Sequence, residues 1–300
     1  MIKIVKVIIF ILLLVMCDCV SNVMFNFLQD NALKQSPTGM IAEYTVKMVD
    51  SEIVIIGSSR AANHYVSSIL ADSLSYSVYN CGSGGNLFYY QTCMIDAILR
   101  RYAPKMIIWE LDPLFLSSIN DNLELDRLSR LLPLHNSNTY IDSILYKRSK
   151  FEKIKVKSAM YRYNSRLTNL LACCSMPDHF DRGYSPLNTE GYKFPSIEKE
   201  ILSDSYSGER EELFIRIIEK CLFENVEIVF CFSPKLTESN YHENLSYKRI
   251  IEIASNKNLR LIDFYHDEKF MNDSTLFYNS NHLNDRGAKK YTMEIVAKLR

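Results

Sequence analysis

The sequence has no excess of charge of either sign. Lysine plus arginine number 35, and aspartate plus glutamate also number 35, so the formal net charge is zero. Because surfaces that bind polyanions concentrate positive charge, we expect no nucleic-acid partner. Internal repeats and low-complexity tracts are also missing. With 47% hydrophobic and 23% charged residues, the composition indicates an ordinary globular chain rather than a disordered or fibrous one.

The spacings typical of metal and cofactor sites are missing as well. The eight cysteines form no CxxC pair and are too sparse for a disulfide scaffold, so most are expected to be small buried hydrophobes. Four histidines are scattered without an HExxH pattern: His135, His179, His242 and His266. The glycine stretch GSGG is followed by no GK[ST] and matches no dinucleotide fingerprint. We therefore expect neither a metal nor a cofactor.

A long hydrophobic run stands at the start of the chain. Lys3 and Lys6 precede the apolar segment VIIFILLLVM, which ends at Met16. This order of a basic and then a hydrophobic region is typical of a secretion signal. No small-x-small cleavage pattern follows it, which favours an uncleaved anchor, and Met16 before Cys17 disfavours a lipidation site.

Extended to about residue 29, the run has the length of a membrane span. Asp18 then falls near its middle at a cost of about 3 kcal/mol, which more than a dozen apolar side chains at about 0.3 to 0.6 kcal/mol each outweigh. By the positive-inside rule, Lys3 and Lys6 stay in the cytoplasm. We therefore predict a signal-anchor over residues 1–29 that holds residues 30–300 outside the inner membrane, in the periplasm or its equivalent.

Short apolar segments alternate with helix-period segments over the rest of the chain. Strands are predicted at residues 53–57, 76–81, 105–111, 226–232 and 259–263, and helices at 87–102, 208–223, 244–256 and 285–299. This alternation predicts a doubly wound α/β domain with a parallel sheet. The stretch from about 113 to 204 is too long for one loop, so we expect a helical insertion between strands three and four. Its tail from Arg182 is either a cap over the site or a packing embellishment.

Two polar motifs are expected at one edge of this sheet. The first strand ends in GSSR, where Ser59 would expose its hydroxyl beside the free N–H groups of a helix start, although a serine there is also a common N-cap. His282 stands in NSNHLNDRGAKKY, after the last strand and just before a helix. A histidine is the usual base for a serine nucleophile, because its pKa is near neutral. Arg60 and His64 lie within about one helical turn of Ser59 and are expected either to contact substrate or to be exposed to solvent or act as a local cap.

A glycine-rich loop, YNCGSGGN, follows the second predicted strand. Gly82, Gly84 and Gly85 allow backbone N–H groups to approach an oxyanion. The same loop also fits a plain tight turn, so both readings stay open on the glycines alone.

In this order, GSSR, NxGxxGN and xxNHLNxxGA resemble the SGNH/GDSL hydrolase superfamily. The resemblance covers most of the chain beyond residue 50 and is nearest to membrane-anchored bacterial members with GSSRA in place of GDS, which resemble acyl-modifying proteins of cell-surface polymers. It implies a three-layer α/β/α sandwich similar to flavodoxin. It also implies a nucleophile at Ser59, a base at His282, and an oxyanion hole from Gly85 and the Ser59 N–H. Asn86 and Arg60 are then candidates for oxyanion or substrate binding.

Two positions depart from that pattern. After the third strand the chain reads WELDP with no asparagine, and the Asp112 carboxylate would repel an oxyanion. Asn279 stands three residues before His282, where the superfamily has the aspartate that orients the base. In another serine triad an Asp-to-Asn change lowers turnover about ten-thousandfold, whereas Cys-His-Asn sites work with asparagine. Asp285 or Asp273 is an alternative acid.

These patterns together predict a serine-dependent esterase or acyltransferase. Its expected substrate is an acylated, most simply O-acetylated, glycan or other polymer of the cell envelope, with a membrane acyltransferase as a candidate partner. The rival interpretation is a catalytically inactive SGNH-like protein that binds glycan or assists assembly, and Asn279 is its main motivation.

Overall fold

The computed structural model describes residues 2–178, 180–188 and 196–300. The chain divides into two compact units. The smaller unit joins Met1–Tyr44 to Leu128–His179, and the larger joins Thr45–Arg127 to Phe180–Arg300.

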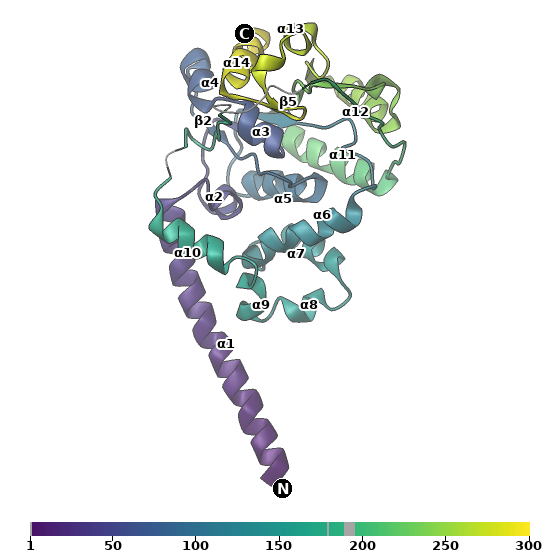
Figure 1. Cartoon of the computed structure of the whole chain (residues 1–300). Helices are drawn as coiled ribbons and strands as arrows, with labels where there is room; N and C mark the ends of the chain where they lie inside the picture. Colours follow the sequence, from purple (N-terminus) through teal and green to yellow (C-terminus); the bar gives the residue numbers. More distant parts are fainter. Residues whose placement is uncertain (1, 179, 189–195) are drawn as a thin grey trace. The chain divides into compact units, whose positions relative to one another are not determined.

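A five-stranded parallel sheet forms the centre of the larger unit (Figure 1). Its strands are β1 (Ile53–Ile56), β2 (Val78–Asn80), β3 (Met106–Glu110), β5 (Glu227–Phe232) and β7 (Arg260–Asp263), in the order β2-β1-β3-β5-β7. Every residue of β1 and β3 is buried, which explains why these strands are continuous apolar runs rather than alternating patterns. All five predicted strands are confirmed.

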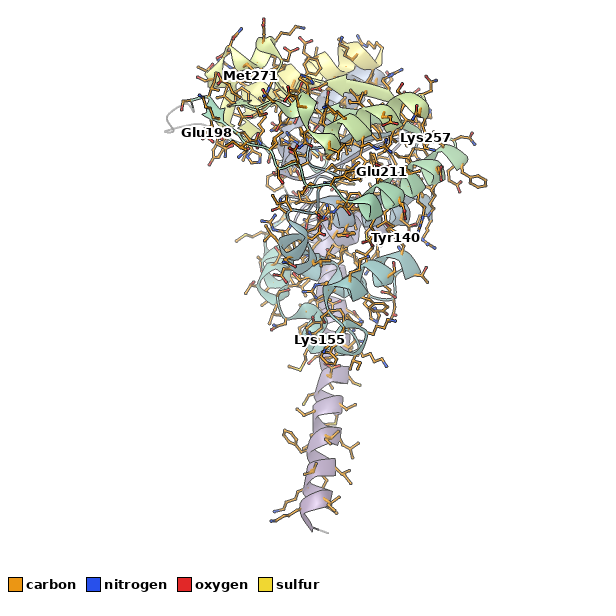
Figure 2. The ribbon with its side chains drawn as sticks, turned by 90° about the vertical axis from the view of Figure 1, so that its right-hand side faces the viewer. Tyr140, Lys155, Glu198, Glu211, Lys257 and Met271 are labelled. Carbon is orange, nitrogen blue, oxygen red and sulfur yellow. The ribbon has the colours of Figure 1, made fainter. Side chains whose placement is uncertain are left out.

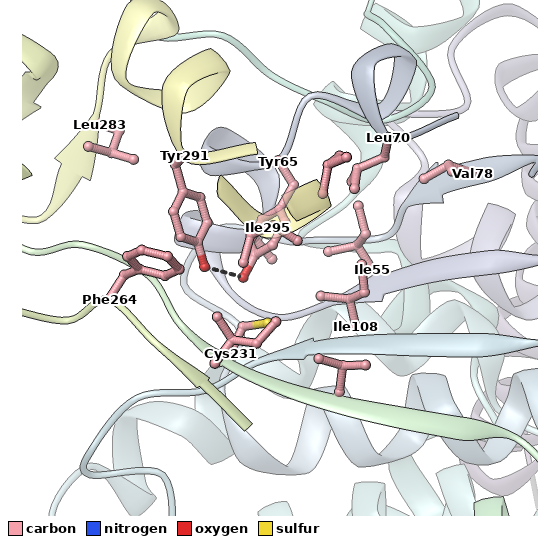
Figure 3. Packing of buried hydrophobic residues seen from close by; sticks show 14 of the residues in the cluster. Ile55, Tyr65, Leu70, Val78, Ile108, Cys231, Phe264, Leu283, Tyr291 and Ile295 are labelled. Atoms are coloured by element: carbon pink, nitrogen blue, oxygen red, sulfur yellow. Dashed lines mark hydrogen bonds between the residues drawn. The ribbon is translucent and has the colours of Figure 1, made fainter. Parts of the chain in front are cut away.

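Helices cover both faces of the sheet. On one face lie α3 (Ser59–His64), α4 (Ser67–Leu74) and α14 (Asp285–Leu299); on the other lie α5 (Phe88–Leu99), α11 (Gly208–Phe223) and α12 (Leu245–Asn256). Figure 3 shows the first interface, where Ile55 and Ile108 of the sheet pack below Tyr65 and Tyr291. On the second face Trp109 packs edge-on against Phe214. The predicted three-layer α/β/α fold is confirmed.

The remaining elements of the larger unit are short. They are α6 (Asp121–Arg127), β4 (Glu198–Lys199), β6 (Thr237–Glu238), η3 (Tyr241–Glu243), α13 (Glu268–Met271), η4 (Ser274–Leu276), β8 (Phe277–Asn279) and β9 (His282–Leu283). Two small ladders join β4 to β6 and β8 to β9. The second ladder carries the histidine and the asparagine of the predicted site.

The smaller unit is helical throughout its described elements. It contains α1 (Ile2–Gln35), η1 (Leu128–Leu134), α7 (Thr139–Leu145), η2 (Tyr146–Arg148), α8 (Glu152–Lys155), α9 (Ala159–Tyr163) and α10 (Leu167–Ser175), while α2 (Ile41–Lys47) runs across the boundary between the units. Most of these helices belong to the predicted insertion between β3 and β5.

The tail of the insertion packs on the larger unit as far as it is described. Ser185 N–H donates to Ala62 O, and Asn63 donates to Ser185 O. Gly183 has φ +86°, and a Cβ there would lie 2.0 Å from Asn80 O, so only glycine fits. These contacts favour the packing interpretation for residues 182–188, whereas residues 189–195 of the same tail lie outside the described part of the chain.

The first helix, α1, contains the predicted segment 1–29. It is one continuous helix of 34 residues. Its most apolar window has a mean hydropathy of 2.7, and none of that window is buried. By length and composition this is the one candidate membrane span among the described residues, and both a membrane anchor and a signal sequence fit it.

Candidate active site

Ser59 lies at the carboxyl edge of the sheet, where open α/β sheets bind ligands. It is the first residue of α3 and follows β1 by only three positions. Gly57 permits this sharp turn, because a Cβ there would lie 2.6 Å from Ala61 Cβ and 2.8 Å from Glu110 Cβ. The neighbouring Ser58 is the N-cap and makes no side-chain cap hydrogen bond. The Ser59 hydroxyl is therefore not used as a helix cap.

His282 reaches Ser59 from the β8–β9 ladder. Its Nε2 lies 2.8 Å from Ser59 Oγ, and its Nδ1 lies 3.0 Å from Asn279 Oδ1. The backbone N–H of Asn281 donates to the same Asn279 oxygen at 3.0 Å, which identifies this amide atom as the acceptor. Because an amide oxygen only accepts, His282 carries its proton on Nδ1 and leaves Nε2 free to accept from Ser59.

The surroundings of His282 keep it neutral. Burial, together with the positive charges of Arg60 and Lys235, lowers the pKa of His282 to about 4. A neutral imidazole is the form that accepts a proton, so His282 is in the base form at neutral pH. The low pKa also makes it a weak base.

Asp285 and Asp273, the alternative partners for the His282 ring, make their hydrogen bonds to other residues. Asp285 accepts from Tyr184 and pairs with Lys289. Asp273 accepts from Thr275 and pairs with Arg286. The structure therefore places Asn279, rather than either aspartate, on the imidazole.

The glycine loop passes beside the serine. A Cβ at Gly84 would lie 3.8 Å from Ser59 Cβ, and Gly82 is tight against α3, because its Cβ would lie 2.3 Å from Ala62 N. Gly85 has φ +74° and lines the same cavity as Ser59. Asn86 does not line this cavity; it is buried, and its amide donates to Ser83 Oγ at 2.7 Å. Its position fits support of the loop rather than contact with substrate.

A cavity of about 250 Å³ opens over Ser59 and His282. Its predicted lining residues are Ser59, Arg60, Gly85 and His282; the lining residues that the sequence analysis did not assign to the site are Ser58, Leu87, Asp112, Arg127, Lys235 and Asn281. Lys235 is the third residue after β5, in CFSPK, so its place just after a strand indicates a residue at the sheet edge. Arg127, at the end of α6, donates to Gly85 O at 2.8 Å and carried no such signal.

Arg60 is buried rather than at the surface, with 6% of its surface exposed. Its Nη2 donates to Leu111 O at 2.8 Å and to Asp112 Oδ2 at 3.0 Å, and its Nε lies 3.5 Å from Glu110 Oε1. Asp112 is thus paired with a cation, which offsets its repulsion of an oxyanion. The remaining nitrogen, Nη1, is buried without a partner among the described residues.

A second polar group contains His64, whose ring centroid lies 6.1 Å from that of His282. His64 Nδ1 lies 2.8 Å from Ser233 Oγ, and Ser233 donates from Oγ to Glu110 Oε1 at 2.6 Å. His64 Nε2 accepts from the backbone N–H of Leu283 at 3.0 Å. Both His64 and Ser233 are fully buried. This group connects the ends of β3 and β5 to the residue that follows His282.

No metal cluster is found in the part of the chain that the structure describes, since no three His, Cys, Asp or Glu side chains there are grouped to hold an ion. All eight cysteines are free, and five of them are buried.

No protein-family model matches the chain, and no curated protein matches its sequence. Among solved structures, an acetyl xylan esterase is similar with 14% sequence identity and a TM-score of 0.42, over 83% of this chain and 99% of that chain. A likeness this distant carries no argument about activity.

Proposed function

We propose that this chain is a serine-dependent esterase or acyltransferase of the SGNH type, with Ser59 as nucleophile and His282 as base. One observation carries the proposal. Hydrogen bonds run in line from Asn279 Oδ1 through His282 to Ser59 Oγ, and they end at a cavity. A serine activated by a correctly protonated histidine is the recurrent solution for acyl transfer.

The proposed reaction has two balanced halves. In the first, Ser59 Oγ bonds to the ester carbonyl carbon while His282 Nε2 takes the hydroxyl proton and then passes it to the leaving alcohol. The backbone N–H of Ser59 has no intrahelical partner, because it opens α3, and together with the Gly85 N–H it is the proposed donor pair for the oxyanion. In the second half, water or a sugar hydroxyl attacks the acyl-enzyme by the same steps in reverse.

Asn279 limits the rate without removing the mechanism. When an asparagine replaces the orienting aspartate in another serine triad, the imidazole takes the wrong tautomer. Here the Asn281 N–H holds the amide oxygen toward His282 and so preserves the productive tautomer. What Asn279 does not supply is a negative charge for the imidazolium, so we expect slow turnover.

The cavity favours a short acyl group on a polar substrate. Among the described residues Leu87 is the one apolar side chain in the lining, and the volume of about 250 Å³ is small for a ligand site. Arg127 and Lys235 lie at the same cavity and suit hydroxyl or anionic groups. With α1 as an anchor that places the larger unit outside the inner membrane, the inferred substrate is an O-acetylated glycan of the cell envelope.

The test is hydrolysis of p-nitrophenyl acetate by the full chain in detergent. Wild type and Ser255→Ala, which changes an exposed serine on α12, should turn over equally, and Ser59→Ala should fall to the uncatalysed rate. Equal rates for wild type and Ser59→Ala would rule out this mechanism. Background rates for all three folded proteins would instead favour the inactive, glycan-binding alternative.

A further inference from the structure

The insertion carries a strongly basic segment, KRSKFEKIKVK, over residues 147–157, which we call the basic tip. It contains six cationic residues and a single acid, Glu152. Glu152 is buried at 1% exposure and accepts from Arg148, Ser149 and Tyr161. Arg148 pairs with this acid, and Lys155 Nζ lies 3.9 Å from it. The five lysines of the tip are all exposed: Lys147, Lys150, Lys153, Lys155 and Lys157.

Large apolar side chains are exposed among these lysines. Phe151 is 54% exposed, Ile154 is 69% exposed, and Met160, just after the tip, is 54% exposed. Single exposed apolar residues are ordinary, but an aromatic and an aliphatic side chain interleaved with lysines are typical of segments that lie in a membrane interface. The long lysine stems can lie along apolar surface while their charged ends stay at the headgroups.

Asp18 fixes the tip to a defined level of α1 within the smaller unit. Its carboxylate accepts from Ser158 Oγ at 2.7 Å and from the backbone N–H groups of Ala159 and Met160, both at 2.9 Å. One turn further along α1, Arg162 donates to Asn22 at 2.6 Å. The start of α9, which follows the tip directly, is thus bonded to α1 where the apolar run ends. Figure 2 shows Lys155 at this level, where α1 continues alone toward the N-terminus.

This attachment sets where a bilayer surface meets the protein. The Asp18 carboxylate and its three donors form a polar cluster that belongs outside hydrocarbon. Even counted from residue 2, and so including Lys3 and Lys6, whose long side chains can extend to the headgroups, α1 up to residue 17 spans about 24 Å, less than the hydrocarbon thickness of about 30 Å. Beyond Asp18, Val20, Val23 and Phe27 keep one exposed apolar face on α1, at 64%, 70% and 66% exposure. Together with Phe151 and Ile154, these side chains supply apolar surface for the part of the bilayer that residues 2–17 do not span.

We propose that the basic tip lies on the bilayer that α1 enters, with Phe151 and Ile154 in the interfacial layer and the five lysines over anionic phospholipid headgroups. The proposal rests on the anchoring role proposed for α1 and not on the esterase activity. Charge complementarity identifies the lipid, since lysine clusters next to a membrane helix favour anionic headgroups.

Quenching of tryptophan fluorescence by brominated lipid tests this placement in the full chain. The native Trp109 is fully buried and gives an unquenched baseline. Phe151→Trp is compared with Phe10→Trp in the apolar run and with Phe223→Trp, an 83% exposed aromatic at the end of α11 that has no lysine cluster. We expect strong quenching at positions 10 and 151 in vesicles that contain phosphatidylglycerol, and little at position 223.

The outcomes separate the anchor from the tip. Quenching at position 10 but no more at 151 than at 223 would overturn the docking of the tip while leaving the anchor intact. No quenching at position 10 would overturn both. Equal quenching at 151 in vesicles of phosphatidylcholine alone would overturn the preference for anionic lipid.

A charge variant provides the matched control. In the Phe151→Trp background, changing Lys150, Lys153 and Lys157 to Gln should lower the quenching several-fold in anionic vesicles. Changing Lys248, Lys289 and Lys298, which are exposed lysines on α12 and α14, should leave it unchanged. An equal loss from both triple variants would contradict a specific role of the tip.

Discussion

Two serine–histidine pairs lie in the larger unit, and their separations are the same. Ser59 Oγ to His282 Nε2 and Ser233 Oγ to His64 Nδ1 both measure 2.8 Å. Their proton arrangements are opposite. His282 has Nε2 free to accept the Ser59 proton, whereas His64 already accepts from Leu283 N–H on Nε2 and therefore donates from Nδ1 to Ser233.

Access separates the two pairs as well. Ser59 and His282 line a cavity, while Ser233 and His64 are fully buried. The Ser233 hydroxyl also donates its hydrogen bond to Glu110, so it cannot donate to His64. Tautomer and access, rather than the distance between serine and histidine, therefore distinguish a nucleophile from a structural hydroxyl.

The largest expected effect comes from removing His282. His282→Ala should lower kcat/KM for p-nitrophenyl acetate by about 10²- to 10⁴-fold, because general base catalysis contributes that much. The control is His242→Ala, which changes an exposed histidine on η3 and should leave the rate unchanged. A folded His282→Ala protein with wild-type kcat/KM would remove the distinction between the two pairs.

Removing the Glu110 carboxylate should lower the free energy of unfolding. Glu110 accepts from Ser233 and Tyr65 and faces Arg60, and burial raises the pKa of its carboxyl. Glu110→Ala leaves a buried cation partly uncompensated, so we expect the free energy of unfolding in urea to fall by about 3 kcal/mol. Glu110→Gln, which keeps an acceptor for Ser233, should lose less. If both variants unfold like wild type, the buried pair is not a structural support.

A carboxylate in place of the Asn279 amide should shift the pH dependence of kcat/KM. The base must be neutral to act, and the pKa of His282 is about 4, so wild-type kcat/KM should fall only below about pH 5. In Asn279→Asp the new carboxylate stabilises the imidazolium and raises this pKa by about 1 to 3 units. The acid limb of the pH–rate profile should therefore move to higher pH. A wild-type limb near pH 6.5 that the substitution does not move would contradict the described environment.

The smallest expected effect comes from His64. His64→Ala leaves the Leu283 N–H without an acceptor and removes the donor to Ser233 Oγ, which keeps its own bond to Glu110; this should lower the free energy of unfolding by about 1 to 3 kcal/mol. Its kcat/KM, measured where the variant is folded, should change far less than that of His282→Ala. A loss of activity as large as in His282→Ala would assign His64 to the chemistry.

The fold was predictable because its signals are local. Continuous apolar runs marked the strands, and helix-period patterns placed α11 and α14 at their observed bounds. Ser59 opens the helix after β1, and Asn279 and His282 stand between β7 and α14, so their meeting at one sheet edge followed from the topology. Their catalytic roles stay a prediction.

Other features depend on tertiary contacts that no local pattern encodes. His64 and Ser233 are 169 positions apart, and only the packed structure shows that they are bonded. Arg127 reaches the cavity from the insertion. From the sequence, Asp18 was expected to lie within a membrane span, where its charge is unfavourable. In the structure its carboxylate accepts three hydrogen bonds at the start of α9.

Labelling with a fluorophosphonate probe, located by mass spectrometry, tests the central claim most directly. The probe reacts only with a serine whose proton is removed and whose oxygen is accessible. We expect one label per chain, on Ser59, and none on Ser233. The rate of labelling at Ser59 should fall strongly in His282→Ala. A folded protein that takes no label, or that is labelled equally well in His282→Ala, would contradict the account.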